Sequence, residues 1–377
     1  MARTKIAFII TKLELGGAQK SVLYTAQNID GDLFEPFLLT GPGGYFDDSA
    51  RQNIKNTFFI KSLQRAVNPF KDAAALWQII RTLREIKPDI VHTNSSKAGI
   101  LGRLAAWFCR AKIVHTVHGF GFHDRQNSLV QKFYILLERF FAKCTDELIF
   151  VSLMDLQTAL SLKIAPVEKC KIIRAGVELK TKEDFKNFDK SAKLAELGLS
   201  TDSKIILCAA NLKPQKNPLD MVRAAKIVRA KFPEAVFLYL GTGELQKQTQ
   251  DLIDSYSLQN NFKLLGHRGD TPQLLAIADV FALSSLWEGL PMAVVEALSM
   301  QVPAVCYNAG GIGEVVKNGQ DGYLVNRGDY EALAQYIIHV LEGGLTFNAD
   351  AIDLKEFDIK EMLKKQQDLY TALMQWR

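Results

Sequence analysis

The stretch WEGLPMAVVE, residues 287–296, places two carboxylates eight positions apart across an expected junction between a loop and a helix. Pro291 suits the first position of a helix, because its missing N–H would be unpaired there in any case. Glu288 then lies in the loop, and Glu296 lies about a turn and a half inside the helix. At about 100° per residue, eight steps leave two side chains within roughly 80° of each other. Both carboxylates can face one site beside free backbone N–H groups, which points to a nucleotide-sugar site.

The composition is that of a globular protein with more than one core. At 377 residues the chain is too long for one ordinary core, so two domains are expected. Hydrophobic residues make up 48% of the chain and charged residues 23%. No apolar run is long enough to span a bilayer, and residues 5–11 are expected to form a strand rather than part of a signal peptide.

The distribution of charge and the use of cysteine bear on partners and location. The formal net charge of +5 is modest and by itself rules out neither nucleic acid nor a membrane surface. The lack of a concentrated basic stripe disfavours nucleic acid. The five cysteines are scattered and form no CxxC pair, which disfavours zinc and favours free thiols in a reducing cytoplasm. The expected location is therefore cytoplasmic, and peripheral contact with the inner face of the cytoplasmic membrane stays open.

Strand-like apolar runs alternate with helical patterns in two successive series, which predicts parallel sheets covered by helices on both faces. The expected fold class is α/β, with two doubly wound Rossmann-like domains facing a cleft. Residues 1–177 would form the first domain, the polar, lysine-rich residues 178–200 a linker, and residues 201–358 the second domain. A final helix over residues 359–376 is expected to pack back on the first domain.

In doubly wound sheets, ligands bind where strands end and loops lead into helices. In the first domain, Gly16 and Gly17 follow the first strand, so the backbone could approach a ligand there. The G-x-G-x-x-G spacing is absent, and residues 40–44 offer no acid for a ribose, so an NAD site is disfavoured. A tight turn without a ligand is the alternative.

Two histidines lie at the expected end of another strand, His115 and His118. Gly119 frees the backbone beside His118, so we favour His118 as a hydrogen-bonding group in the site, against a purely structural role. Residues 92–96 form a further polar segment, and we expect Asn94, Ser95 or Ser96 simply to cap the following helix.

Three strand-end loops of the second domain combine glycines with charged groups. The loop at residues 210–218 carries Lys213 and Lys216, which suit a diphosphate, although a loop lysine is often only solvated. Gly241 opens the loop at residues 241–244, where the backbone can approach a ligand closely. The third loop covers residues 308–314.

Together these motifs resemble the family-four retaining glycosyltransferases of GT-B fold, over nearly the whole chain. The most specific part is the pair of glutamates at residues 288 and 296, with the glycines of residues 310–311. Residues 172–178, IIRAGVE, resemble the inter-domain signature of the family, and residues 91–93 and 118–120 resemble its acceptor-domain pattern.

The resemblance implies a role for each matching position. Glu288 would hold donor-sugar hydroxyls, beside the backbone N–H groups of Gly289 and Leu290, and Glu296 would bind the ribose. Lys216 would neutralise the leaving diphosphate, which Gly16 and Gly17 would approach from the first domain, while His118 would contact the transferred sugar.

The chain departs from the family pattern at two positions of one loop. An arginine usually stands where this chain has Asn211, and asparagine supplies neither the charge nor the bidentate geometry of a guanidinium. Lys213 is a candidate substitute from two residues away. Asn217 replaces the last glycine of the same pattern. Weaker phosphate binding, altered donor choice and loss of activity all stay open.

The predicted function is retaining transfer of a sugar from a nucleoside diphosphate, UDP or GDP, to a hydroxyl acceptor. The acceptor would be a saccharide or lipid-linked saccharide of cell-surface polysaccharide or glycolipid synthesis, and no metal or other cofactor is expected. A sugar-nucleotide epimerase of GT-B fold and a non-catalytic nucleotide-sugar-binding homologue are the alternatives. The aromatic and basic residues of the helix expected at 129–142 suit either an anionic lipid surface or a core helix with basic edges.

Overall fold

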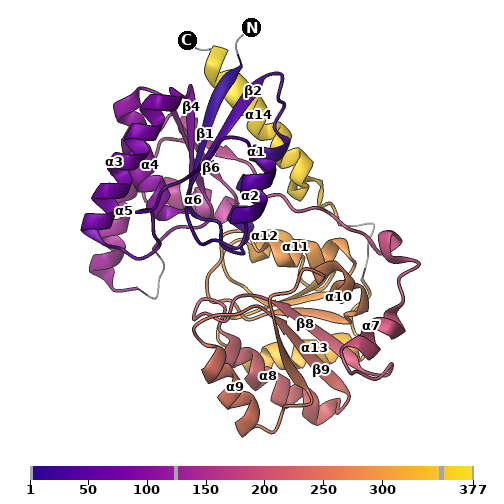
Figure 1. The fold of residues 1–377 in the computed structure, drawn as a ribbon. Helices are drawn as coiled ribbons and strands as arrows, with labels where there is room; N and C mark the ends of the chain where they lie inside the picture. Colours follow the sequence, from indigo (N-terminus) through magenta and orange to yellow (C-terminus); the bar gives the residue numbers. More distant parts are fainter. Residues whose placement is uncertain (1–2, 123–125, 348–351, 376–377) are drawn as a thin grey trace. The chain divides into compact units, whose positions relative to one another are not determined.

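The computed structural model describes residues 3–122, 126–347 and 352–375. The contacts divide the chain into two compact units, one made of residues 1–177 and 356–377 and the other of residues 178–355 (Figure 1). The first unit is therefore built from both ends of the chain. Each unit carries one parallel sheet, so the prediction of two doubly wound α/β units is confirmed.

The first unit is built on a seven-stranded parallel sheet in the order β3-β2-β1-β4-β5-β6-β7. The order of the strands reverses between β1 and β4, and doubly wound sheets bind ligands at such a switch point. The strands are β1 (Thr4–Lys12), β2 (Phe34–Gly41), β3 (Thr57–Phe59), β4 (Ile90–Asn94), β5 (Lys112–Val117), β6 (Glu147–Phe150) and β7 (Cys170–Ile172). The helices are α1 (Gly17–Asn28), α2 (Asp47–Asn53), α3 (Pro69–Ile86), α4 (Ser96–Cys109), α5 (Ser128–Lys143), α6 (Leu153–Ser161) and α14 (Ile359–Gln375).

Alternate residues of β1 pack on opposite faces of this sheet, as the two-residue period of a strand requires. Phe8 and its alternate neighbours pack with α1 and α14. Ile9 points the other way and packs with α3 and α4. Because both faces are covered, β1 is apolar along most of its length, and this explains the continuous run IAFII in the sequence.

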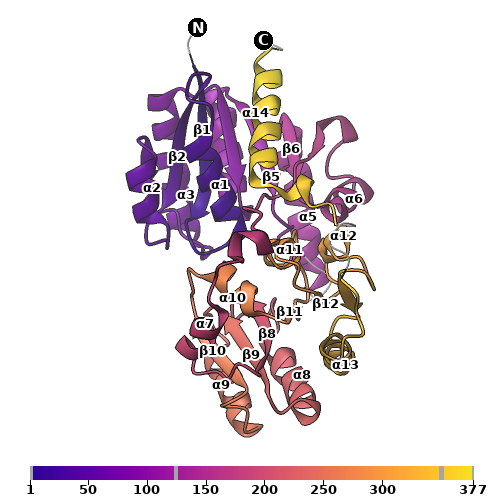
Figure 2. The same cartoon turned by 90° about the vertical axis from the view of Figure 1, so that its right-hand side faces the viewer.

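The C-terminal helix α14 belongs to the core of the first unit and lies beside α1 (Figures 1 and 2). The returning chain is joined to residue 177 by two backbone hydrogen bonds of 2.9 Å, Val177 N–H to Phe357 O and Ile359 N–H to Val177 O. Tyr370 is fully buried, and its hydroxyl lies 2.6 Å from Nδ1 of His92 on β4. The expected helix at 359–376 is therefore present to Gln375, and residue 376 lies outside the described residues.

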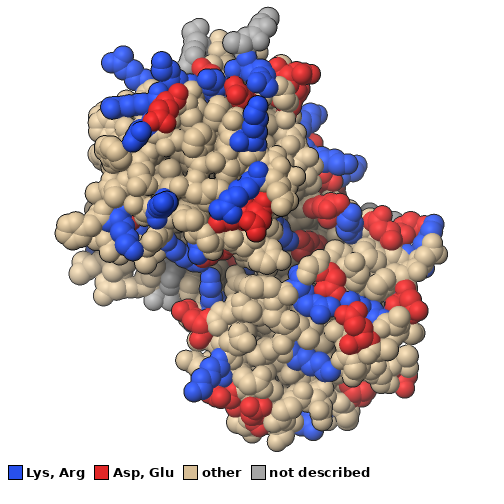
Figure 3. Space-filling model, in the orientation of Figure 1, with Lys and Arg blue, Asp and Glu red and all other residues tan. Residues whose placement is uncertain are grey.

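The second unit carries a six-stranded parallel sheet in the order β10-β9-β8-β11-β12-β13. Its strands are β8 (Lys204–Ala209), β9 (Ala235–Leu240), β10 (Phe262–Gly266), β11 (Val280–Leu283), β12 (Ala304–Tyr307) and β13 (Gly322–Val325). Its helices are α7 (Lys190–Glu196), α8 (Pro218–Lys231), α9 (Gln246–Ser255), α10 (Thr271–Ile277), α11 (Met292–Ser299), α12 (Ile312–Val315) and α13 (Tyr330–Leu341). Acidic and basic side chains are interspersed over the face of this unit drawn in Figure 3.

Residues 178–200, expected to be a linker, are structured and belong to the second unit. They contain the short helix η2 (Lys182–Phe185), which begins with a capping box at Thr181, and α7. Lys193 of α7 donates hydrogen bonds to Glu196 and Asp270. The polar and charged residues of this segment thus form helix caps and ion pairs. Their composition alone does not distinguish them from a solvated linker.

We predict that Tyr370→Phe lowers the stability of the first unit while keeping its ring packing. The change removes the hydroxyl that pairs with His92 and leaves a buried ring nitrogen without that partner, at a cost of about 1–3 kcal/mol. Hydrogen exchange of the β1 and β4 amides measures the effect locally. Thr371→Val is the matched control, because Thr371 is exposed and its hydroxyl bonds only to its own helix, at Gln367 O. Equal protection in the two variants would contradict the prediction.

Candidate functional site

In the second unit, the loops that follow β8 and β11 are joined to each other. The two strands are neighbours in the sheet, so their carboxyl ends lie side by side. Gln215 Nε2 donates to Trp287 O at 2.8 Å, and Leu286 N–H donates to Gln215 O at 2.8 Å. The Ser284 hydroxyl donates to the backbone of the first loop as well. These bonds fix residues 211–217 against residues 284–290.

The result of this pairing is an ion pair between two of the predicted site residues. The Lys216 ammonium donates to Oε1 of Glu288. The Glu288 side chain is only 7% exposed and that of Lys216 is 21% exposed. A carboxylate this buried requires a cation or several donors. The sequence motifs indicated both residues but gave them separate ligands, and they did not predict that the two side chains contact each other.

A glycine in a third loop fixes the backbone of Glu288. Gly310 follows β12 with a φ of +56°, and a Cβ at this position would lie 1.9 Å from the carbonyl oxygen of Glu288. Gly311 N–H donates to Gly289 O at 2.9 Å. The pair of glycines at 310–311 thus has a steric explanation, since any side chain at 310 would push the Glu288 loop away.

The start of α11 leaves backbone donors beside this carboxylate. The N–H groups of Gly289 and Leu290 donate to no other residue that the structure describes. Pro291 is the N-cap residue and α11 begins at Met292, so the helix starts one residue later than predicted. Glu296 is half-buried on the second turn of this helix. Free donors and two carboxylates therefore occupy the stretch 288–296, as a site for a hydroxyl- and phosphate-bearing ligand requires.

The loop after β8 explains one of the two departures from the family pattern. Asn217 adopts a left-handed conformation, with φ +47° and ψ 56°, which glycine favours and asparagine tolerates better than other residues. Its side-chain amide donates to Asp220 Oδ2 at 2.5 Å. Asn217 therefore keeps the turn that its glycine equivalent would make.

Asn211 and Lys213 lie at the beginning of the loop after β8, and Gly241 lies in the loop after β9, which packs against it. A Cβ on Gly241 would lie 2.2 Å from Ala210 O and 3.3 Å from Asn211 Cα, so Gly241 is required by close packing of two loops. The side chain of Asn211 makes no hydrogen bond within the described part of the chain. Lys213 is half-buried, and Lys216 N–H donates to its carbonyl oxygen at 2.9 Å, which closes the turn.

In the first unit, Gly16 caps α1 and Gly17 is its first residue. The φ of Gly16 is −172°, an extended conformation open to any residue, but a Cβ there would lie 2.6 Å from Oε1 of Gln19. Gln19 Nε2 in turn donates to Lys12 O at 3.3 Å. Gly16 therefore leaves room for the Gln19 side chain, which hydrogen-bonds to the last residue of β1.

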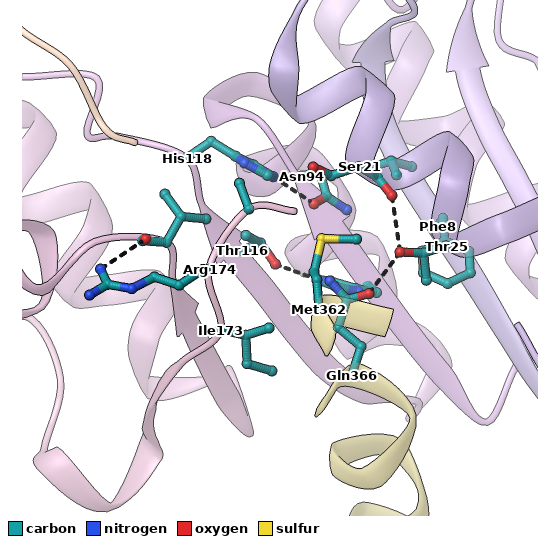
Figure 4. Close-up of a pocket in the computed structure, with 14 residues that line it drawn as sticks. Phe8, Ser21, Thr25, Asn94, Thr116, His118, Ile173, Arg174, Met362 and Gln366 are labelled. Carbon is teal, nitrogen blue, oxygen red and sulfur yellow. Dashed lines mark hydrogen bonds between the residues drawn. The ribbon is translucent and has the colours of Figure 1, made fainter. Parts of the chain in front are cut away.

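His118 directly follows β5 and faces a small pocket (Figure 4). Its Nε2 lies 3.1 Å from Oδ1 of Asn94, and Gly119 beside it has a φ of +111°. Burial lowers the pKa of His118 to about 4, so the ring is neutral at pH 7. A neutral imidazole can exchange hydrogen bonds with a hydroxyl without adding charge.

Two buried polar atoms line the pocket with His118, the hydroxyl of Ser21 and Nδ2 of Asn94. Neither has a hydrogen-bond partner among the described residues. The volume of about 10 Å³ holds roughly one water molecule. Asn94 ends β4 and bonds to His118, so it does not cap α4 as expected.

The other histidine candidate, His115, is buried within the sheet, where its Nδ1 lies 2.9 Å from the hydroxyl of Thr93. Ser95 precedes α4, but its side chain bonds to the hydroxyl of Thr11 at 2.8 Å instead of capping the helix. Thr11 takes over that role by accepting a hydrogen bond from Ala98 N–H at 3.2 Å. Sequence spacing could not reveal a cap supplied by a neighbouring strand.

Neither a metal cluster nor a membrane span is found in residues 3–122, 126–347 and 352–375. No cluster of three or more histidine, cysteine or acidic side chains in these ranges is arranged to hold a metal ion. No helix in the same ranges combines the length and apolar character needed to cross a bilayer.

Each of the two α/β units is built on one parallel sheet, and the second carries the paired Lys216 and Glu288. This is the architecture of the GT-B class of glycosyltransferases. Residues 15–181 match the family model described as Glycosyltransferase Family 4, and residues 189–353 match Glycosyl transferases group 1. The chain belongs to this family, and it is a glycosyltransferase.

Relatives and solved structures agree with this assignment. The Escherichia coli protein named UDP-Gal:alpha-D-GlcNAc-diphosphoundecaprenol alpha-1,3-galactosyltransferase is 34% identical over 99% of this chain and 98% of its own. The putative glycosyltransferase EpsD of Bacillus subtilis is 27% identical over 72% of each chain. The structure of HepE from Anabaena with UDP and glucose superposes with a TM-score of 0.84, at 22% identity, over 98% of this chain and 100% of that one.

We predict that Gly310→Ala reduces glycosyl transfer strongly, because its methyl group would displace the Glu288 backbone. Gly319→Ala is the matched control, since Gly319 also has a positive φ, +78°, but nothing lies within 4 Å of the position that a Cβ would take there. Both variants carry similar backbone strain, of about 1 kcal/mol. Initial rates and nucleotide affinity distinguish them. A Gly310→Ala enzyme as active as the Gly319→Ala enzyme would show that the Glu288 loop needs no such support.

Proposed function

We propose that the protein transfers a sugar from a UDP-linked donor to a saccharide carried on a lipid diphosphate, with retention of the anomeric configuration. The observation that carries the proposal is the Lys216–Glu288 pair beside the free N–H groups of Gly289 and Leu290. The choice of donor base and acceptor class is supported by the activity for which the Escherichia coli relative is named, since its identity to this chain extends over nearly its whole length.

In the proposed reaction, Glu288 binds hydroxyls of the donor sugar and Lys216 stabilises the charge that develops on the departing diphosphate. Glu288 holds the ammonium in place before the donor binds, so no reorganisation of charge is needed during the reaction. Glu296 binds the ribose, and Gly16 and Gly17 bring backbone toward the diphosphate. Asn211, Lys213 and Gly241 lie in the loops that would surround the donor.

The acceptor hydroxyl attacks the anomeric carbon on the face from which the diphosphate leaves. A phosphate oxygen of the leaving group takes the proton of that hydroxyl, so the mechanism requires no carboxylate nucleophile. Lys216 and the backbone N–H groups supply the positive charge that a divalent cation supplies in other transferases, and we propose that neither a metal nor another cofactor is required. The neutral His118 would hydrogen-bond the transferred sugar near the reacting carbon.

Two measurements test this function. In a thermal-shift panel of UDP- and GDP-linked sugars, the true donor raises the melting temperature in proportion to RT ln(1 + [L]/Kd). Incubation of that donor with a lipid-diphosphate saccharide should then give a lengthened saccharide and free UDP. Conversion of the donor sugar without any acceptor would identify an epimerase instead, and binding without turnover would identify a non-catalytic homologue.

Lys216→Ala and Glu288→Gln should each reduce kcat/KM for transfer by about a hundredfold or more, the usual effect of removing one stabilising group from a transition state. Lys231→Ala is the control, because Lys231 forms an exposed ion pair with Glu342, 3.1 Å long, elsewhere in the same unit. Removing such an exposed pair should leave transfer unchanged. Near-normal rates for both site variants would remove the assignment of Lys216 and Glu288.

We further propose that the first unit contacts the surface of an anionic membrane through α5. One face of this helix carries Leu129, Phe133, Leu136 and Phe140, all well exposed and spaced at helical intervals. Lys132 and Lys143 are exposed along the edge of the same face. We call these six residues the α5 stripe. In Figure 3 the corresponding part of the first unit is largely uncharged with isolated basic groups. An apolar face edged by lysines suits the boundary between headgroups and acyl chains.

The triple substitution Phe133→Ser, Leu136→Ser and Phe140→Ser should abolish flotation with vesicles that contain anionic phospholipid. The control is Phe70→Ser with Trp77→Ser, which removes two other exposed apolar side chains, on α3. That control should float as the unchanged protein does. Equal binding of the triple variant would place the membrane contact elsewhere or rule it out.

A further inference from the structure

The first unit contains a cavity of about 460 Å³ that none of the motifs discussed above predicted. It lies at the carboxyl end of β1 and is bounded by the loop after β1, the segment around Arg65, the start of α4 and one side of α5. Its volume is in the range of small-molecule sites, which bury most of a ligand of that size.

Five charged side chains line the cavity, and four of them form two ion pairs. Arg65 contacts Glu14 at 2.7 Å, and Lys97 contacts Asp72 at 2.7 Å. The fifth charged side chain is Lys12, which is half-buried and has no ion-pair or side-chain hydrogen-bond partner in the described part of the chain. One positive charge therefore faces the cavity without compensation.

Two polar groups of the cavity wall have no hydrogen-bond partner in the described part of the chain. The first is the Lys12 ammonium, which lies near the loop after β2, since a Cβ added at Gly43 would be in van der Waals contact with Nζ at 3.6 Å. Ser96 lines the same cavity with a hydroxyl that makes no hydrogen bond among the residues described. An anion that enters the cavity and binds Lys12 would gain a charge-assisted hydrogen bond without breaking either existing ion pair.

The opposite wall of the cavity is apolar and is supplied by α5. Phe133, Tyr134 and Leu137 line it. Phe133 also belongs to the α5 stripe, and its side chain is 58% exposed. The cavity is thus continuous with the surface that we propose to lie on a membrane. A ligand that fits both parts has an anionic, hydroxyl-bearing head and an apolar chain.

We propose that this cavity binds the diphosphate and adjoining sugar of the lipid-linked acceptor, with Lys12 as the cation for the diphosphate. The inference rests on the proposed function for the class of acceptor, but the binding site is argued from the cavity itself. The lipid chain would leave along the α5 stripe toward the bilayer, and the aromatic wall would contact the sugar. Lys12 is thereby assigned a role in acceptor specificity that is separate from the donor site of the second unit.

The test uses two water-soluble acceptors that carry the same saccharide, one on a short alkyl diphosphate and the other as a neutral alkyl glycoside. Short chains remove any need for a membrane. Lys12→Gln should raise the KM for the diphosphate acceptor by about tenfold or more, the effect of losing one hydrogen bond to a charged group. The KM for the neutral glycoside and the affinity for the nucleotide donor should stay within about twofold.

Lys12→Arg is the conservative variant and should restore most of the discrimination, because it keeps the charge. Lys55→Gln is the matched control, since Lys55 is exposed in the same unit and does not line the cavity. Lys12→Gln acting equally on both acceptors, or on neither, would overturn the assignment of the cavity while leaving the proposed function intact.

A binding measurement separates the cavity from the reaction. Titration with a short alkyl diphosphate that carries no sugar, in the presence of saturating UDP, should show binding that is lost in Lys12→Gln and kept in Lys216→Ala. If no acceptor is ever glycosylated but this binding pattern is found, the cavity assignment stands and the proposed acceptor reaction fails. Binding of inorganic phosphate as tightly as of the alkyl diphosphate, with the same dependence on Lys12, would identify a general phosphate site and overturn the lipid-linked assignment.

Discussion

Burial of a carboxylate is the constraint around which the second unit is organised. Glu288 is almost fully removed from solvent, and its charge is compensated there by the Lys216 ammonium. The cation comes from a loop 72 residues earlier in the chain, so the two loops have to be held in register. Gln215 and Ser284 do this by hydrogen bonds, and Gly310 does it by leaving no side chain in the way. The glycines and polar residues of these loops thus bring the two members of one ion pair together, by close packing and by hydrogen bonds. The candidate ligand site is formed by the same loops.

The first unit satisfies its buried polar groups differently. His92 and His115 lie inside the sheet, and burial lowers the pKa of each below its usual value. They are neutral and bond to hydroxyls, His92 to Thr116 and Tyr370 and His115 to Thr93. His118, at the end of β5, is held by Asn94. The buried histidines of this sheet are therefore neutral, and the unpaired charge of Lys12 lies at the carboxyl end of β1, where it lines the cavity.

The sequence predicted the two α/β units and most strand-end loops, because hydrophobic periodicity and glycine positions are local signals. It also placed Glu288, Lys216 and His118 in such loops. It could not predict that Lys216 contacts Glu288, since the pairing of distant loops depends on sheet order. Nor could it reveal the cavity beside Lys12, which is assembled from four separate segments. The polar residues 178–200 were mistaken for a linker because helix caps and ion pairs have the same composition as a solvated segment, and Asn217 looked like a defect until its left-handed conformation was known.

The return of α14 to the first unit has a consequence for synthesis on the ribosome. The sheet of the first unit is complete in sequence by residue 172, yet its core also needs Ile359, Met362 and Tyr370. Until residues 359–370 emerge, His92 lacks the Tyr370 hydroxyl and the apolar face beside α1 stays uncovered. The second unit, made of contiguous residues, has no such dependence. A nascent chain can therefore complete the second unit before the first, and a stop codon before residue 359 would remove core residues of the first unit.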